Sequence, residues 1–80
     1  MQRDAIMAKL TNVFRSVFDD DTLILTDRTS ANDIEEWDSL NQIKIILATQ
    51  TAFAIRLPAD KINKLQNVGE MLDFLSERLA

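Results

Sequence analysis

The sequence predicts an all-α fold, a small four-helix bundle of three long helices and one short helix, with a long loop between the first two. Composition is the first reason, because 46% of the residues are hydrophobic while the chain has one Gly and one Pro, which favours helices over turn-rich β structure. The second reason is the recurrence of apolar residues at spacings of three and four. We expect residues 1–80 to form a single domain, near the lower size limit for folding without covalent or metal cross-links.

The first helix is expected from about Arg3 to Phe18, where five apolar residues form one stripe: Ile6, Leu10, Val13, Phe14 and Val17. About twenty residues without sustained periodicity follow, and so long a loop in a small domain is usually either functional or a wrong assignment. A short helical turn could form around Asn32 to Glu35. We expect the apolar residues of this loop to hold it against the bundle; they are Leu23, Ile24, Leu25, Ile34 and Trp37.

The second helix is expected to begin at Asp38-Ser39, since both residue types cap helices well. It should run to about Ala54 and end before Pro58, because the residue that precedes a proline avoids the helical region.

The segment from Ala59 to Leu65 is long enough for a short third helix only. Asn67 should cap a fourth helix, from about Val68 to Leu79.

The second helix has more apolar residues than one face can use. At about 100° per residue, the natural core side holds Ile45, Ile46, Thr49 and Phe53. Leu40 and Leu47 fall on nearly the opposite side, alongside Lys44 and Thr51, and Ile43 falls at the border. Leu40 and Leu47 therefore form either an exposed contact stripe or a surface that the short third helix covers.

The charge of the chain is concentrated in one segment. The net charge is −4, but Asp19 to Asp38 alone carries eight acids and one base, a net −7, which leaves +3 for the remainder. An acidic protein repels nucleic acid and anionic membranes, so we expect neither as a partner and expect basic partner surfaces instead. The alternative is that the acids only keep a long loop solvated.

Several classes of function are disfavoured. Without Cys or His, the chain has no disulfide, no thiolate metal site and no histidine general base. Glu35 and Glu36 are adjacent and point apart, and Asp19-Asp20-Asp21 lacks the spacing of a calcium loop. We therefore expect no catalytic residue and no metal. No stretch approaches the roughly 18 apolar residues of a membrane span, and the acidic start of the chain is unlike a signal peptide, so the expected compartment is the cytoplasm.

Ser39 combines three of these features. It lies at a helix start, beyond an acidic loop, with an apolar stripe extending away from it. A helix N-terminus offers unpaired N–H groups and the positive end of a dipole, which suit a phosphate ester. By spacing alone, however, Asp-Ser before a helix is most often only a cap.

The chain resembles the acyl carrier protein family, whose Asp-Ser-Leu motif at the start of the second helix is found here as Asp38-Ser39-Leu40. The register that follows strengthens the resemblance, because like residues recur without a gap to Leu75: Ile43, Ala48, Phe53, Leu57-Pro58, Lys64, Leu65, Val68 and Asp73-Phe74-Leu75. The resemblance covers essentially the whole chain and is weakest between Asp19 and Glu36.

The resemblance implies a four-helix bundle whose Ser39 hydroxyl is esterified by 4'-phosphopantetheine, taken from coenzyme A by a phosphopantetheinyl transferase. Because the chain has no Cys, the thiol that holds the acyl cargo as a thioester comes from this arm. Further partners would be acyl-loading and condensing enzymes, and the carrier itself would be a non-catalytic monomer.

The resemblance also implies roles for further residues. Asp38 would cap the helix and help the transferase to recognise the site. Partners would contact an apolar surface formed by Leu40, Leu47 and Ile62, next to Lys44, which is the single charged residue of the helix. A pocket for the acyl chain would be lined by Ile43, Ile46, Ile62 and Leu72.

Two departures point away from the carrier of general fatty acid synthesis. Its second helix is strongly acidic, whereas here Gln50, Thr51 and Ala52 are uncharged and Lys44 is the only charge from Ser39 to Ala54. The residues before Asp38 are Glu35-Glu36-Trp37 rather than Leu-Gly-Ala or Leu-Gly-Gly. We therefore expect a specialised carrier of a fatty-acid-like, polyketide or other biosynthesis, whose partners recognise the acidic loop and a nearly neutral helix.

Two rival interpretations remain. A carrier of aminoacyl or peptidyl groups in nonribosomal synthesis usually has Gly-Gly before Asp-Ser or His-Ser, which this sequence lacks, and the chain looks free-standing. An unmodified helical interaction module would use the Leu40 and Leu47 stripe as a docking surface.

Overall fold

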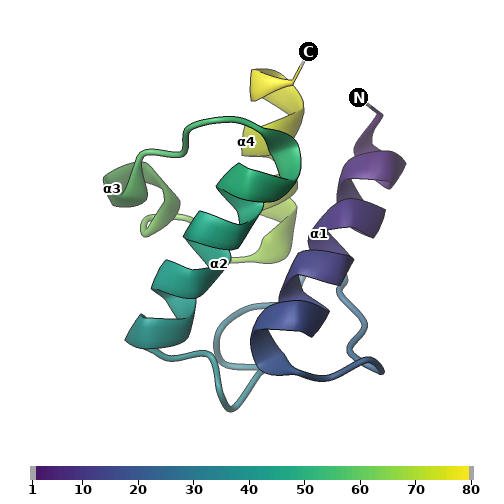
Figure 1. Ribbon diagram of the computed structural model, residues 1–80, viewed down its shortest axis with the longest axis vertical. Coiled ribbons are helices and arrows are strands. Elements are labelled where there is room, and N and C mark those ends of the chain that lie inside the picture. Colours follow the sequence, from purple (N-terminus) through teal and green to yellow (C-terminus); the bar gives the residue numbers. More distant parts are fainter. Residues whose placement is uncertain (1, 80) are drawn as a thin grey trace.

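The computed structural model describes residues 2–79, and all regular elements in that range are α-helices. They are α1 (Arg3–Phe18), α2 (Ser39–Phe53), α3 (Ala59–Ile62) and α4 (Val68–Arg78). Figure 1 shows α1 running down the molecule, the long loop crossing its lower end, and α2 and α4 running back up, so that both chain ends lie at the top. The predicted all-α class, the helix order and the long loop between the first two helices are confirmed.

The ends of the helices follow local capping chemistry. The Asp38 carboxylate accepts a hydrogen bond from the backbone N–H of Asn41 at 2.9 Å, so α2 begins at Ser39. Asn67 caps α4 in the same way, by accepting from the N–H of Glu70 at 2.9 Å. At the other end of α2, Ala54 adopts a left-handed conformation with φ 54° that ends the helix. α3 stops at Ile62 and is shorter than the expected segment.

The core lies where α1 packs against α2 and α4. Its fully buried side chains include Ile6, Leu10, Phe14, Ile45, Leu72 and Leu75. α2 contributes the four residues expected from the helical pattern, since its buried residues are Ile45, Ile46, Thr49 and Phe53. The spacing of apolar residues therefore predicted correctly which face of α2 turns inward.

The loop between α1 and α2 is attached to the bundle by side chains and by backbone. Leu25 and Ile34 are each 7% exposed and belong to the core, whereas Ile24 is 75% exposed, so the expectation that Ile24 holds the loop was wrong. The carbonyl oxygens of Asp27 and Thr29 accept from the first backbone N–H groups of α4, those of Gly69 and Val68, at 2.9 and 2.8 Å. The loop thereby satisfies donors that α4 cannot satisfy itself.

No helix forms around residues 32–35, contrary to the suggested helical turn. Residues 31–33 and 35–36 form separate turns instead. The reason is a local side-chain bond: a carboxylate oxygen of Asp33 accepts from the backbone N–H of Ser30 at 3.0 Å while the Asp33 N–H donates back to the Ser30 carbonyl at 2.9 Å. This reciprocal pair favours a turn over helix propagation.

Arg3 ties the start of α1 to two other parts of the molecule. Its guanidinium forms ion pairs with Asp73 of α4 and with Asp27 of the loop, the latter at 3.2 Å. It also donates to the carbonyl oxygen of Gly69 at 3.4 Å. The hydrogen bond to Asp73, followed by that to Asp27, raises the pKa of Arg3.

No helix within residues 2–79 is long and apolar enough to cross a membrane.

Candidate functional site

Ser39 is the first residue of α2. Figure 1 shows that α2 begins at the lower end of the molecule, where it meets the loop. The Ser39 side chain is exposed, and its hydroxyl makes no hydrogen bond to any of the described residues. The capping role belongs to Asp38, which leaves the Ser39 hydroxyl free. A serine that is exposed, unpaired and at a helix N-terminus is available for chemical modification.

The backbone around Ser39 is held by short-range bonds. Besides capping through its carboxylate, Asp38 accepts the first helical hydrogen bond, from the N–H of Gln42 at 2.9 Å. The side-chain amide of Asn41 donates to the carbonyl oxygen of Glu36 at 2.6 Å. These contacts fix the approach of the loop to α2, so the position of Ser39 is determined by its neighbours on both sides.

A cleft of about 590 Å³ opens beside Ser39, between α2 and α3. Ser39 and Asp38 lie on its rim, and its lining also includes Trp37, Gln42, Asn63 and Met71. Of the predicted pocket residues, Ile43, Ile46 and Ile62 line this cleft. Leu72 is not among the residues that line this cleft; its side chain is 1% exposed and lies in the core.

The outer face of α2 is apolar and open. Leu40, Ile43 and Leu47 are 61%, 55% and 57% exposed. α3 therefore does not cover them, and the exposed-stripe alternative is the correct one. Ile62 is only 2% exposed, so it offers no foothold on the surface and belongs to the wall of the cleft instead. Lys44, on the same outer side of α2, is exposed.

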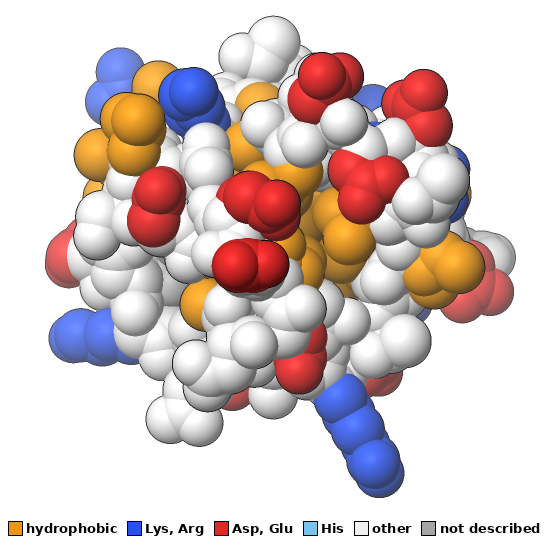
Figure 2. Space-filling model, turned by 90° about the horizontal axis from the view of Figure 1, so that it is seen from below, with side chains coloured by type: hydrophobic (Ala, Val, Ile, Leu, Met, Phe, Trp, Pro, Cys, Tyr) orange, Lys and Arg blue, Asp and Glu red, His pale blue; other side chains and the backbone are white. Residues whose placement is uncertain are grey.

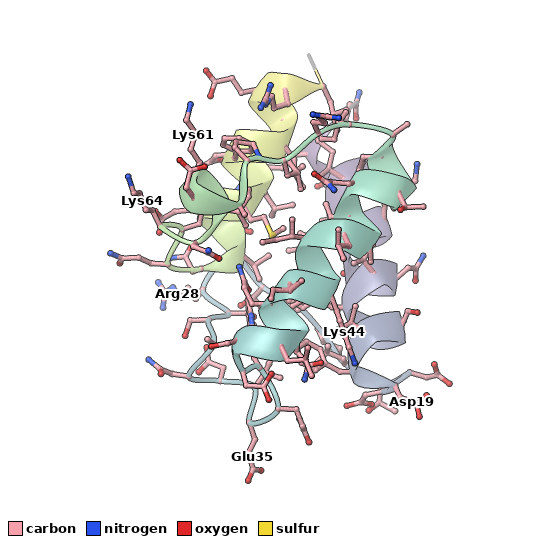
Figure 3. The ribbon with its side chains drawn as sticks, turned by 60° about the vertical axis from the view of Figure 1, so that its left-hand side comes forward. Asp19, Arg28, Glu35, Lys44, Lys61 and Lys64 are labelled. Atoms are coloured by element: carbon pink, nitrogen blue, oxygen red, sulfur yellow. The ribbon has the colours of Figure 1, made fainter. Side chains whose placement is uncertain are left out.

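Acidic side chains surround the end of the molecule at which α2 begins. Figure 2 looks at this end and shows carboxylates spread across it, with apolar side chains between them. Asp19 and Glu35 lie low in Figure 3, whereas Lys61 and Lys64 point outward from the region of α3. Within the acidic loop, the hydroxyl and then the backbone N–H of Thr22 donate to the Asp20 carboxylate at 2.7 and 3.0 Å and lower its pKa.

The residues that hold the cleft together were not predicted as a group. Gln42 bridges Trp37 on one side and Asn63 on the other, by hydrogen bonds of 2.6 and 3.3 Å. One signal was present in the sequence, because Gln42 lies three residues after Ser39 and such positions share a helix face. The partnership with Asn63 was not visible, since the two residues come from separate helical segments.

The residues present suit a phosphopantetheine group on Ser39. The hydroxyl is accessible, and the N-terminal end of α2 favours a negative charge. Because both positions are exposed, the high dielectric of water keeps the repulsion between a phosphodiester on Ser39 and Asp38 small. The adjoining cleft has amide side chains at its rim and buried apolar ones at its floor, which matches an arm that carries amides and ends in a cargo.

Comparison with known proteins agrees with the fold and with this site. No protein-family model matches the chain. An acyl carrier protein from Guillardia theta is 31% identical over 61 residues, which cover 76% of this chain and 74% of that protein. An acyl carrier protein from Acidothermus cellulolyticus is 24% identical over 76 residues, 95% of this chain and 90% of that one.

Among solved structures, the solution NMR structure of a holo acyl carrier protein from Geobacter metallireducens superposes with a TM-score of 0.84. It is 40% identical in sequence, and the match covers 92% of this chain and 85% of that chain. The helical bundle, the exposed serine at the start of α2 and these similarities define a class of small carrier proteins. The chain belongs to the acyl carrier protein family.

Proposed function

We propose that Ser39 carries 4'-phosphopantetheine and that the chain transports an acyl or similar carboxylic-acid intermediate between enzymes. The observation that supports this most directly is the Ser39 hydroxyl, which is exposed, unpaired among the described residues and next to a cleft, in a chain of this family. When bound, the group supplies the thiol that holds cargo as a thioester, a function for which the chain has no Cys of its own.

The attachment is a phosphoryl transfer in which Ser39 is the acceptor. Its Oγ forms a bond to the coenzyme A phosphorus nearest the pantetheine, and the diphosphate bond to the adenosine half of the molecule breaks. Adenosine bisphosphate leaves, and the hydroxyl proton passes to a base of the transferase. Asp38 contributes by fixing the start of α2, so that Ser39 is presented in one orientation.

We further propose that this is a specialised carrier, of a fatty-acid-like, polyketide or other biosynthesis, rather than that of general fatty acid synthesis. Support comes from α2, whose only charge from Ser39 to Ala54 is the cation Lys44, and whose Gln50, Thr51 and Ala52 are uncharged where acids are expected in the general carrier. The acidic end of the molecule would meet basic partner surfaces, and the apolar face of α2 would supply contact area. In this proposal residues 1–80 form one non-catalytic carrier domain, monomeric and cytoplasmic.

Intact mass spectrometry after incubation with coenzyme A and a broad-specificity transferase tests the attachment. The wild-type chain should gain the mass of one phosphopantetheine, and Ser39→Ala should gain nothing. Ser16→Ala is the matched control, since Ser16 is an exposed serine on α1, and it should be modified at the wild-type rate. If the wild-type chain stays unmodified with every transferase tried, the chain is an unmodified interaction module and the proposal is wrong.

A further inference from the structure

Gln42 presents a hydrogen-bond donor at the rim of the cleft beside Ser39. The indole N–H of Trp37 donates to Gln42 Oε1 at 2.6 Å. An indole nitrogen can only donate, so this bond determines which end of the Gln42 amide faces Trp37. The amide nitrogen of Gln42 must then face the other way, where it donates to Asn63 Oδ1 at 3.3 Å. A donor fixed in this way selects a hydrogen-bond acceptor, such as a carbonyl oxygen, as its partner.

The Trp37 side of this arrangement is firmly anchored. The Trp37 ring stands edge-on to Phe14 of α1, with ring centroids 5.1 Å apart and an interplanar angle of 84°, and it also lies near Phe18. Phe14 is fully buried. The backbone N–H of Trp37 donates to the Ile34 carbonyl at 3.1 Å. Trp37 therefore links the amide of Gln42 to the core.

The Asn63 side is much less firmly held. Asn63 is exposed and follows α3, a helix of four residues that Figure 1 shows at the edge of the molecule. Its bond to Gln42 is long, near the upper limit for an N–H···O bond. A carbonyl oxygen from another molecule could replace Asn63 Oδ1 without loss, because one amide acceptor is exchanged for another.

We propose that Gln42 is a binding residue for the phosphopantetheine arm, that its amide nitrogen donates to an amide carbonyl of the arm in place of Asn63 Oδ1, and that Trp37 is its positioning residue. The inference rests on the proposed attachment at Ser39. Gln42 lies one helical turn beyond Ser39 and lines the same cleft. Beyond Gln42, the buried side chains Ile46 and Met71 line the cleft and suit the less polar part of the arm and its cargo.

The decisive measurement is the rate at which the arm thiol of the holo protein reacts with a neutral aromatic disulfide. Gln42→Leu removes the donor, so the arm should leave the cleft more often and react roughly two- to twelvefold faster, the range set by one hydrogen bond. Asn63→Ala removes the competing acceptor, so the arm should be held more and react more slowly. The two variants should change the reaction rate in opposite directions only if the arm and Asn63 compete for the same donor. A general loosening of the cleft would accelerate the reaction in both variants.

Gln66→Leu is the matched control, because Gln66 lines the same cleft but its side chain makes no hydrogen bond to the described residues; its rate should equal that of the wild type. Trp37→Phe keeps an aromatic ring against Phe14 and frees the Gln42 amide to rotate, so it should accelerate the reaction even if Gln42→Leu does not fold. Equal rates in Gln42→Leu and Gln66→Leu, or acceleration in Asn63→Ala, would overturn the inference.

Intact mass spectrometry distinguishes an error about the role of Gln42 from an error about the proposed attachment at Ser39. If the transferase adds no mass to the wild-type chain, the attachment at Ser39 and the role of Gln42 are both wrong. If the mass is gained but the two variants do not move in opposite directions, the attachment stands and the role of Gln42 alone is wrong.

Discussion

Thr49 has its hydroxyl in the middle of the bundle, where it is 0% exposed and has no hydrogen-bond partner among the described residues. An unpaired buried hydroxyl is destabilising, because it loses its bonds to water and gains none in return. Its place in the helical pattern identified Thr49 as a core residue, but the pattern contains no information on whether its hydroxyl finds an acceptor.

Thr49→Val should therefore increase the free energy of unfolding by about 1 kcal/mol and raise Tm by about 4–8 °C. The variant keeps the branched shape and removes only the unpaired hydroxyl. Thr51→Val is the matched control on the same helix, because Thr51 is exposed and its hydroxyl donates to the Leu47 carbonyl at 3.1 Å. Thermal and urea unfolding provide the measurement. If Thr49→Val is less stable than the wild type, the Thr49 hydroxyl has a hydrogen-bond partner in solution.

At the scale of the helices, the start of α2 depends on one carboxylate. Asp38→Ala removes the acceptor for the Asn41 N–H and should lower the free energy of unfolding by about 1 kcal/mol. Asp38→Asn keeps a side-chain oxygen at the same position and should retain most of that stability. Urea unfolding of both variants provides the measurement. If Asp38→Asn loses as much stability as Asp38→Ala, the charge of Asp38 and not its capping bond is what stabilises the helix.

The close backbone contact between the loop and α4 depends on the absence of a side chain at Gly69. A Cβ at this position would lie 2.8 Å from the backbone oxygen of Asp27, closer than such contacts occur. Gly69→Ala should gain up to about 1 kcal/mol from helix propensity, but displacing the loop backbone costs about 1–3 kcal/mol. We expect a net loss of stability in urea unfolding, with faster hydrogen exchange at the Val68 and Gly69 amides. An increase in stability would mean that the loop moves aside freely.

The helices were predictable because their signals are local. Periodic apolar residues located α1 and the inner face of α2, and Asp38 and Asn67 marked the starts of α2 and α4 as caps. The loop was less predictable, because the Asp27 and Thr29 carbonyls accept hydrogen bonds from backbone groups of α4 some 40 residues away. Hydrogen bonds between backbone groups do not require particular side chains, so the sequence does not indicate them. The exposure of Ile24 and the burial of Ile62 depend on this same long-range packing.

The candidate site was also only partly predictable from the sequence. Ser39 and Asp38 were identified as site residues by the resemblance of Asp38-Ser39-Leu40 to the family motif, and the exposure of Leu40 and Leu47 was one of two alternatives that the helical pattern left open. The bridge from Trp37 through Gln42 to Asn63 could not be predicted, because it requires knowing where α3 lies relative to α2. The apolar pattern also could not show which buried residues line the cleft, so it did not distinguish Ile46, which does, from Leu72, which does not.

At the scale of the whole molecule, charge is distributed unevenly, with a net −7 between Asp19 and Asp38 and +3 elsewhere. The proposed specialisation predicts that Lys44→Glu combined with Thr51→Glu lowers kcat/KM with the cognate partner enzyme by roughly three- to tenfold and improves loading by an enzyme of general fatty acid synthesis. Both changes place acids on the exposed side of α2, where partners of the general carrier would meet them. Steady-state rates with both enzymes, at low and high salt, provide the measurement.

A double variant on α1 is the matched control. Lys9→Glu with Ser16→Glu makes the same change in net charge at two exposed positions with the same seven-residue spacing. It should leave both rates near those of the wild type. If the α2 variant changes neither rate, partners do not recognise the neutral face of α2 and the proposed specialisation is wrong.

The aromatic cluster of Trp37, Phe14 and Phe18 also provides a built-in fluorophore. The chain has one tryptophan and no tyrosine, so its near-ultraviolet emission originates from an indole two residues before Ser39. Because that indole contacts the core on one side and Gln42 on the other, its emission spectrum responds both to unfolding and to events at the cleft. The fluorescence of unlabelled protein can therefore be used to follow unfolding and changes at the cleft in real time.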